Sequence, residues 1–153
     1  MKRLFTLAAL CLMVSISVGG QRPDPAESAA HEIVRFEAID VFIDTGEKPL
    51  AAYQFELKAF RGDVMIVGIE GGEHAAFEEP PYYDPAALNN DRVIIADFNT
   101  EKDVPAGRTR LARIHVRVRG KEEPRYRTVL ETAVAPGGKE VADSIALEVE
   151  AND

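Results

Sequence analysis

The strongest constraint on the fold is a series of short segments in which apolar and polar residues alternate with a period of two. The clearest lies at residues 109–120, where aliphatic side chains alternate with basic ones before a glycine ends the run. Successive side chains of an extended strand point to opposite faces, so this pattern gives one apolar face and one polar face. The segment therefore predicts a half-buried strand of an antiparallel sheet.

Six further segments have strand character, alternating or continuously apolar, and turn-forming residues separate them. They are residues 36–44, 50–59, 64–69, 92–98, 128–134 and 144–149. Seven short strands without a convincing amphipathic helix predict an all-β fold, an antiparallel β-sandwich. Only residues 84–90 suit a helical turn, inside a connection of residues 71–91. A loop of that length is uncommon unless it is functional or packs against the body.

The N-terminus has the pattern of a secretory signal peptide. Two basic residues precede an apolar run of about 15 residues, shorter than the roughly 20 that span a bilayer, and small residues and Pro23 follow. We predict a signal peptide at residues 1–20, a flexible linker at 21–33 and the folded domain at 34–150. The predicted location is extracellular or periplasmic, and an uncleaved membrane anchor is the less favoured alternative.

Charge and cysteine content restrict the chemistry of the exported chain. The net charge of −8 becomes −10 when residues 1–20 are removed, because they contain two bases and no acid. The only cysteine, Cys11, leaves with them, so disulfides and thiol catalysis are excluded. An acidic chain is also a poor match for the phosphate backbone, and we expect no nucleic-acid partner.

No catalytic or metal motif is evident, and we predict no enzymatic activity. After residue 20 there are two serines, Ser28 and Ser144, and neither lies in a Gly-x-Ser-x-Gly setting. The three histidines lack metal-ligand spacing, and no cofactor is predicted. A structural calcium ion held by carboxylates of distant loops stays open.

Four segments, taken in order, resemble a known family. Residues 36–44, 50–57, 64–72 and 105–120 are similar to strands of cohesin modules and, more broadly, of the cohesin and cellulose-binding-module superfamily. The resemblance covers residues 35–149. It implies a jelly-roll β-sandwich that acts as a non-catalytic binding module. It also implies that the ligand is either a dockerin-type protein or a polysaccharide.

Tyr82 and Tyr83 are the candidate carbohydrate-binding residues. They follow Pro80-Pro81 and form the one aromatic cluster expected to be exposed in a chain without Trp. Exposed rings stack on the apolar faces of sugars. The equally weighted alternative is a rigid loop that closes the edge of the sandwich.

A stripe of bases on the strand at 109–120 is the candidate surface for a protein partner. Charges of this kind steer an acidic partner and fix its register. The stripe consists of Arg113, His115, Arg117 and Arg119. A solvated outer face is the simpler alternative for it. At the level of function, the alternative is an exported structural protein that assembles with itself or in a surface layer, and a small hydrolase is the least favoured.

Overall fold

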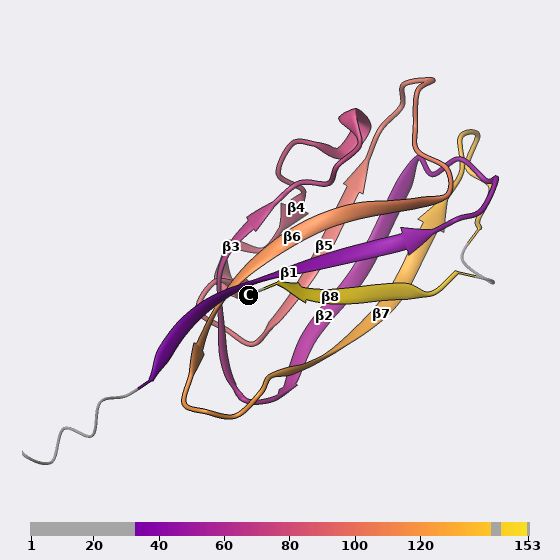
Figure 1. The fold of residues 1–153 in the computed structure, drawn as a ribbon. Helices are drawn as coiled ribbons and strands as arrows, with labels where there is room; N and C mark the ends of the chain where they lie inside the picture. The colour runs from indigo at the N-terminus through magenta and orange to yellow at the C-terminus, as the bar shows by residue number, and fades with distance from the viewer. Residues whose placement is uncertain (1–32, 142–144, 153) are drawn as a thin grey trace, which may run out of the picture. The chain divides into compact units, whose positions relative to one another are not determined.

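The regular secondary structure of the described part of the chain consists almost entirely of strands (Figure 1). The computed structural model describes residues 33–141 and 145–152, which belong to one compact unit spanning residues 31–153. Seven of the eight strands correspond to the seven predicted segments, with shifted ends, and the two-residue strand β4 was not predicted. The strands are β1 (Val34–Asp44), β2 (Ala52–Arg61), β3 (Asp63–Glu70), β4 (Tyr82–Tyr83), β5 (Arg92–Phe98), β6 (Arg108–Arg119), β7 (Arg125–Val134) and β8 (Leu147–Asn152).

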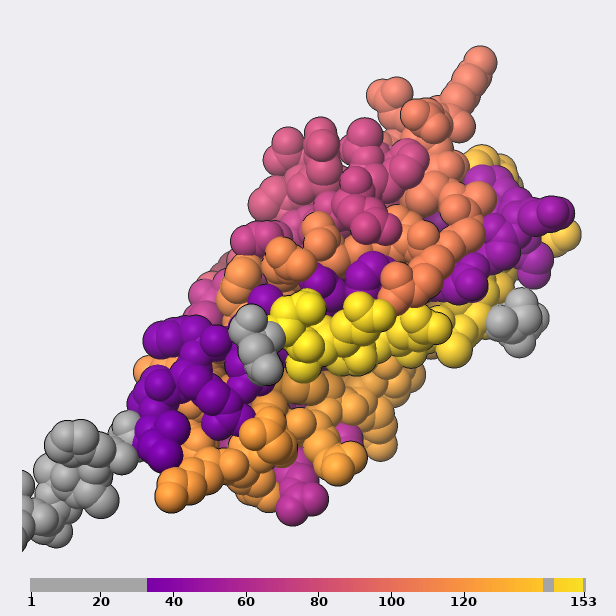
Figure 2. Space-filling model, viewed as in Figure 1, coloured from indigo at the N-terminus to yellow at the C-terminus, as the bar shows by residue number. Residues whose placement is uncertain are grey.

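Two antiparallel four-stranded sheets form a β-sandwich, which confirms the predicted fold class. Sheet A has the strand order β3-β6-β1-β8 and sheet B the order β4-β5-β2-β7. Strands β1, β2 and β3 alternate between the two sheets, as do β5 to β8. Apart from β4 and β5, neighbouring strands of one sheet are therefore not consecutive in sequence. Figure 2 shows the outer face of sheet A, where side chains of β8 lie beside those of β1.

The core lies between the sheets and is formed by every second residue of the long strands, as the period of two predicts. In β6 the inward aliphatic residues have no exposed surface, whereas the bases between them are half-buried. The inward residues of β1 and β2 follow the same rule. The largest fully buried side chains include Ile39, Ile43, Phe55, Leu57, Ile95, Leu111 and Ile114.

A hydrogen bond joins the two sheets inside this core. In β6, Leu111 has no partner on β1, because Val41 pairs with Ala112 and Phe42 with Arg110, and the strand bulges there. The Leu111 carbonyl accepts a hydrogen bond of 3.0 Å from the Tyr53 hydroxyl of β2. Burial raises the pKa of Tyr53 above its ordinary value, so the hydroxyl keeps its proton and remains a donor.

We expect Tyr53→Phe to lower the free energy of unfolding by about 1–2 kcal/mol, because the buried Leu111 carbonyl loses its donor. Tyr126→Phe is the matched control. The Tyr126 hydroxyl is buried and, within the described residues, has no hydrogen-bond partner, so its removal should be neutral or slightly stabilising. Urea unfolding followed by circular dichroism measures both. Equal losses in the two variants would contradict the inter-sheet hydrogen bond.

The connection at residues 71–91 passes from β3 of sheet A to β5 of sheet B and packs against the body. It contains the two 3-10 turns, η1 (Ala75–Phe77) and η2 (Pro85–Ala87), and the two-residue strand β4. The predicted helical turn at 84–90 is thus confirmed in part as η2. Phe77 is buried, and its carbonyl accepts a 2.6 Å hydrogen bond from the Gly72 N–H.

The predicted signal peptide at residues 1–20 lies outside the described residues, as does nearly all of the predicted linker at 21–33. Across the described ranges, the chain forms no helix long and apolar enough to cross a membrane.

Candidate functional site

The clearest candidate site is on the outer face of sheet B, where two aromatic rings lie exposed beside each other. Tyr82 of β4 pairs with Ala96 of β5, and Phe98 lies two residues further along β5. The Tyr82 and Phe98 ring centroids are 6.0 Å apart and the ring planes differ by 9°. The side chains are 66% and 60% exposed. The two stacked rings form an exposed apolar surface on sheet B.

A groove of about 690 Å³ adjoins the aromatic pair, between β5 and the η2 turn. Its apolar lining includes Tyr82 and Ile94, and its polar lining includes Asp84, Asn90 and Arg92. The volume is within the usual range for small-molecule and cofactor sites. We call the groove together with the Tyr82–Phe98 pair the β5 groove.

The wall of the β5 groove is held in place by its own hydrogen bonds. Asp84 Oδ1 accepts from the Ala86 N–H at 2.9 Å, which caps η2. The Asn90 side chain donates to the Ala86 carbonyl at 2.5 Å. The backbone of the next turn pairs with β3, since the Asn89 N–H donates to the Ile66 carbonyl at 2.8 Å. A wall fixed in this way loses little conformational entropy when a ligand binds.

The one arginine that lines the groove forms a salt bridge, whereas the groove's acidic residues form none with any described residue. Arg92 Nη2 donates to Glu56 Oε2 at 2.6 Å, and this hydrogen bond lowers the pKa of the Glu56 carboxyl below its ordinary value. The carboxylates of Asp84 and Asp91 both line the groove, and that of Asp91 accepts no hydrogen bond from any described residue. The groove therefore offers carboxylate acceptors and an apolar ring, with its one guanidinium already paired.

The structure separates the two predicted carbohydrate-binding residues. Tyr82 lies on the exposed face of β4, whereas Tyr83 points the other way, is half-buried and packs against the core. Sequence analysis missed Phe98, although its position is readable in retrospect. Phe98 continues the outward-facing series of β5 that begins at Arg92 and includes Ile94.

The basic stripe lies in the middle of sheet A, and acids on the flanking strands compensate much of it. Arg113 donates two hydrogen bonds to Asp40 of β1, at 2.8 and 2.7 Å. His115 Nε2 lies 2.8 Å from Glu70 Oε1 of β3. Arg119 also has an interaction partner. These contacts agree with the alternative reading of the stripe as part of the sheet's outer surface, and its role in binding a partner stays a prediction.

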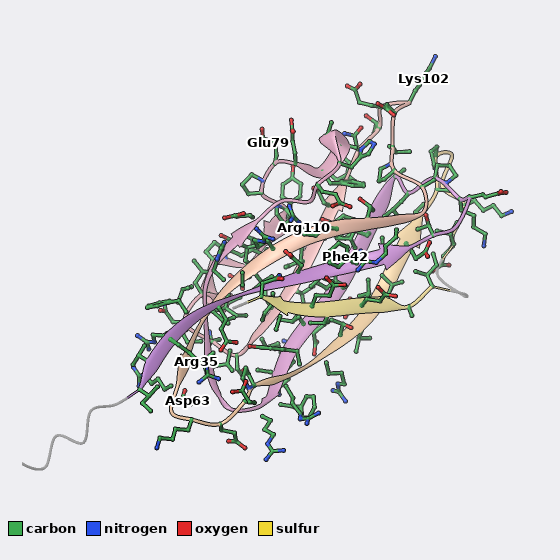
Figure 3. All side chains as sticks on the ribbon, in the orientation of Figure 1. Arg35, Phe42, Asp63, Glu79, Lys102 and Arg110 are labelled. Atoms are coloured by element: carbon green, nitrogen blue, oxygen red, sulfur yellow. The ribbon has the colours of Figure 1, made fainter. Side chains whose placement is uncertain are left out.

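Two further arginines on the outer face of sheet A, Arg117 and Arg108, also contact neighbouring strands. Arg117 Nη2 contacts the Met65 sulfur at 3.1 Å. Arg108 lies over Phe42, with 3.7 Å between its Cζ and the ring centroid, and also contacts Glu148 and Glu150 of β8. Figure 3 marks Phe42 on β1 and Arg110 on β6 of this sheet. Most charged side chains on the outer face of sheet A therefore make internal contacts. Phe36 on β1 is 69% exposed there, but among the described residues only sheet B carries two exposed rings stacked on each other.

Among the described residues, no group of three or more His, Cys, Asp or Glu side chains is placed to hold a metal ion. Comparison with known proteins finds no matching family model, curated protein or solved structure.

Proposed function

We propose that this protein is an exported, non-catalytic module that binds a neutral polysaccharide in the β5 groove. The observation that carries the proposal is the nearly parallel, exposed pair of Tyr82 and Phe98 beside a groove lined with hydrogen-bonding groups. Aromatic rings bind the C–H faces of sugars, and carboxylate and amide groups bind the hydroxyls. The predicted signal peptide and the resemblance to the cohesin and cellulose-binding-module superfamily, with its jelly-roll fold, support the same reading.

The charges of the groove favour an uncharged ligand. Asp84 and Asp91 line it, while Arg92 is already paired with Glu56. A polymer of uronic acids would bring its carboxylates close to those of Asp84 and Asp91. Among the described residues, no unpaired cation lines the groove to receive them, which costs binding energy. Neutral polysaccharides carry hydroxyls that can donate to both carboxylates.

Tyr82→Ala should weaken binding about tenfold, which corresponds to about 1.4 kcal/mol, because one of the two stacking surfaces is lost. Affinity electrophoresis in gels containing hydroxyethylcellulose, xyloglucan or galactomannan measures the change, with polygalacturonate as the charged comparison. Tyr82→Phe should keep most of the affinity, since it keeps the ring. Phe36→Ala is the matched control, because Phe36 is 69% exposed on β1 of the other sheet.

The result that would overturn the proposal is the absence of retardation in every neutral polysaccharide. An equal loss of affinity in Tyr82→Ala and Phe36→Ala would also overturn it, since it would separate binding from the β5 groove.

A further inference from the structure

The outer edge of β7 is the longest open strand edge in the described part of the chain. β7 ends sheet B and pairs on one side with β2. On its other side only the C-terminal end is covered, by the Val134–Glu140 bridge and by a 2.8 Å hydrogen bond from the Val141 N–H to the Ala133 carbonyl. Residues 125–132 therefore present backbone groups that another strand can pair with.

The sequence of β7 is complementary to itself when two copies run antiparallel. If Val129 of one copy faces Val129 of a second copy, then Arg127 faces Glu131 of the second copy, and the reverse pair forms across the axis. Opposite charges on facing residues stabilise an antiparallel pair. Val129 is 44% exposed, so the contact at the centre also removes apolar surface from water.

Glu131 is the extra residue of a bulge in β7 and faces the outer side of sheet B. Gln54 of β2 pairs with Thr132 and Phe55 pairs with Leu130, which leaves Glu131 without a partner position on β2. Its carboxylate contacts the Gln54 side chain. Arg127 makes no salt bridge within the described residues. Both charges thus lie on the outer face of sheet B without a strong competing ion pair.

The other described edge strands lack this complementarity. In β3 the open edge is already hydrogen-bonded at Ile66 to the backbone of Asn89 and Asn90. In β8 the same antiparallel arrangement about Val149 would place Glu148 opposite Glu150 of a second copy. Like charges on facing residues are destabilising. β4 has only two residues, too few for an independent pairing. Self-pairing is therefore favourable at β7 alone among the four described edges.

We propose that β7 pairs with β7 of a second copy of this chain, antiparallel about Val129, to form a homodimer. The two copies of sheet B then become one continuous sheet. Because facing residues of paired strands lie on the same side, both β5 grooves open on one face of that sheet. The pairing itself does not depend on the proposed function. If the proposed function holds, one polymer can occupy both grooves and gain avidity.

Light scattering coupled to size-exclusion chromatography of the purified protein, over a range of concentrations, tests the proposal. We expect a weak, concentration-dependent dimer, because pairing along one strand edge makes a small interface, and a still weaker dimer at high salt. Arg127→Glu and Glu131→Arg should each be monomeric, because each sets like charges opposite one another. The double variant Arg127→Glu/Glu131→Arg should dimerise again.

Mixing the two single variants gives the sharpest readout. Each is expected to be monomeric alone, yet together they should form a heterodimer. In that heterodimer the new carboxylate of Arg127→Glu faces the new guanidinium of Glu131→Arg, and the two unchanged side chains at these positions also face each other with opposite charges. Lys102→Glu is the control for charge alone, since Lys102 lies on the loop between β5 and β6 and not on β7 (Figure 3). A monomer at all concentrations, or a dimer unaffected by either reversal, would overturn the proposal.

Discussion

Gly71→Ala and Gly72→Ala are each expected to lower the free energy of unfolding by about 3–5 kcal/mol, in the range of severe overpacking. A Cβ atom at Gly71 would lie 2.3 Å from the carbonyl oxygens of Glu78 and Glu79, and one at Gly72 would lie 2.4 Å from that of Arg110. All three obstacles are backbone atoms, which cannot turn away as a side chain can. To accommodate the added Cβ atom, the connection at 71–91 would have to move away from the β-sandwich.

Gly68→Ala is the matched control, because it lies in the same strand–loop region of the chain. There the added Cβ would meet only the His115 side chain, at 3.7 Å, an ordinary van der Waals contact. We expect a change within about 1 kcal/mol. Since the chain has no Trp, urea unfolding followed by far-ultraviolet circular dichroism is the suitable measurement. If Gly71→Ala and Gly68→Ala were equally stable, Gly71 could not lie as close to the backbone of Glu78 and Glu79 as the structure places it.

The strands were predictable from the sequence because their signal is local. The period of two in β6 depends only on the burial of one face, and the inward residues Ile114, Val116 and Val118 are all fully buried. The bulge at Leu111 was not predictable, because it results from how β6 pairs with β1, a strand about 70 residues away. β4 has two residues, too few to show any period.

The candidate site was predictable only in part, for the same reason. Tyr82 could be identified from its own neighbours in sequence, but its companion Phe98 lies 16 positions later and reaches it through the β4–β5 pairing. The basic stripe was placed on one face correctly. Its acidic partners Asp40 and Glu70 come from two other strands. The register that brings them beside β6 depends on how the strands pair, which no single segment of the sequence predicts.

Asp40→Asn should lower the free energy of unfolding at neutral pH by about 2–3 kcal/mol, because it removes the acceptor of a nearly buried charged pair. The Asp40 side chain is 7% exposed. It accepts two hydrogen bonds from Arg113 and one of 2.9 Å from Asn152, and Arg110 lies 3.7 Å away. Without the carboxylate, two guanidinium groups share this part of sheet A with no anion between them.

The pH dependence gives this prediction a second readout. Hydrogen bonds from Arg113 lower the pKa of Asp40 below its ordinary value of 3.8, although burial opposes them. A carboxyl with a lowered pKa in the folded state stabilises the fold fully above its unfolded pKa. That contribution is lost as the pH falls through the folded value. The stability difference between the wild type and Asp40→Asn should therefore be constant above about pH 5 and shrink below about pH 4.

Urea unfolding between pH 7 and pH 3 measures this difference, with Glu148→Gln as the matched control. Glu148 also pairs with an arginine, Arg108, but its side chain is 58% exposed. Solvent screening limits such a pair to less than about 1 kcal/mol. A wild-type advantage over Asp40→Asn that stayed constant down to pH 3 would mean that packing, rather than the charge of Asp40, stabilises the centre of sheet A.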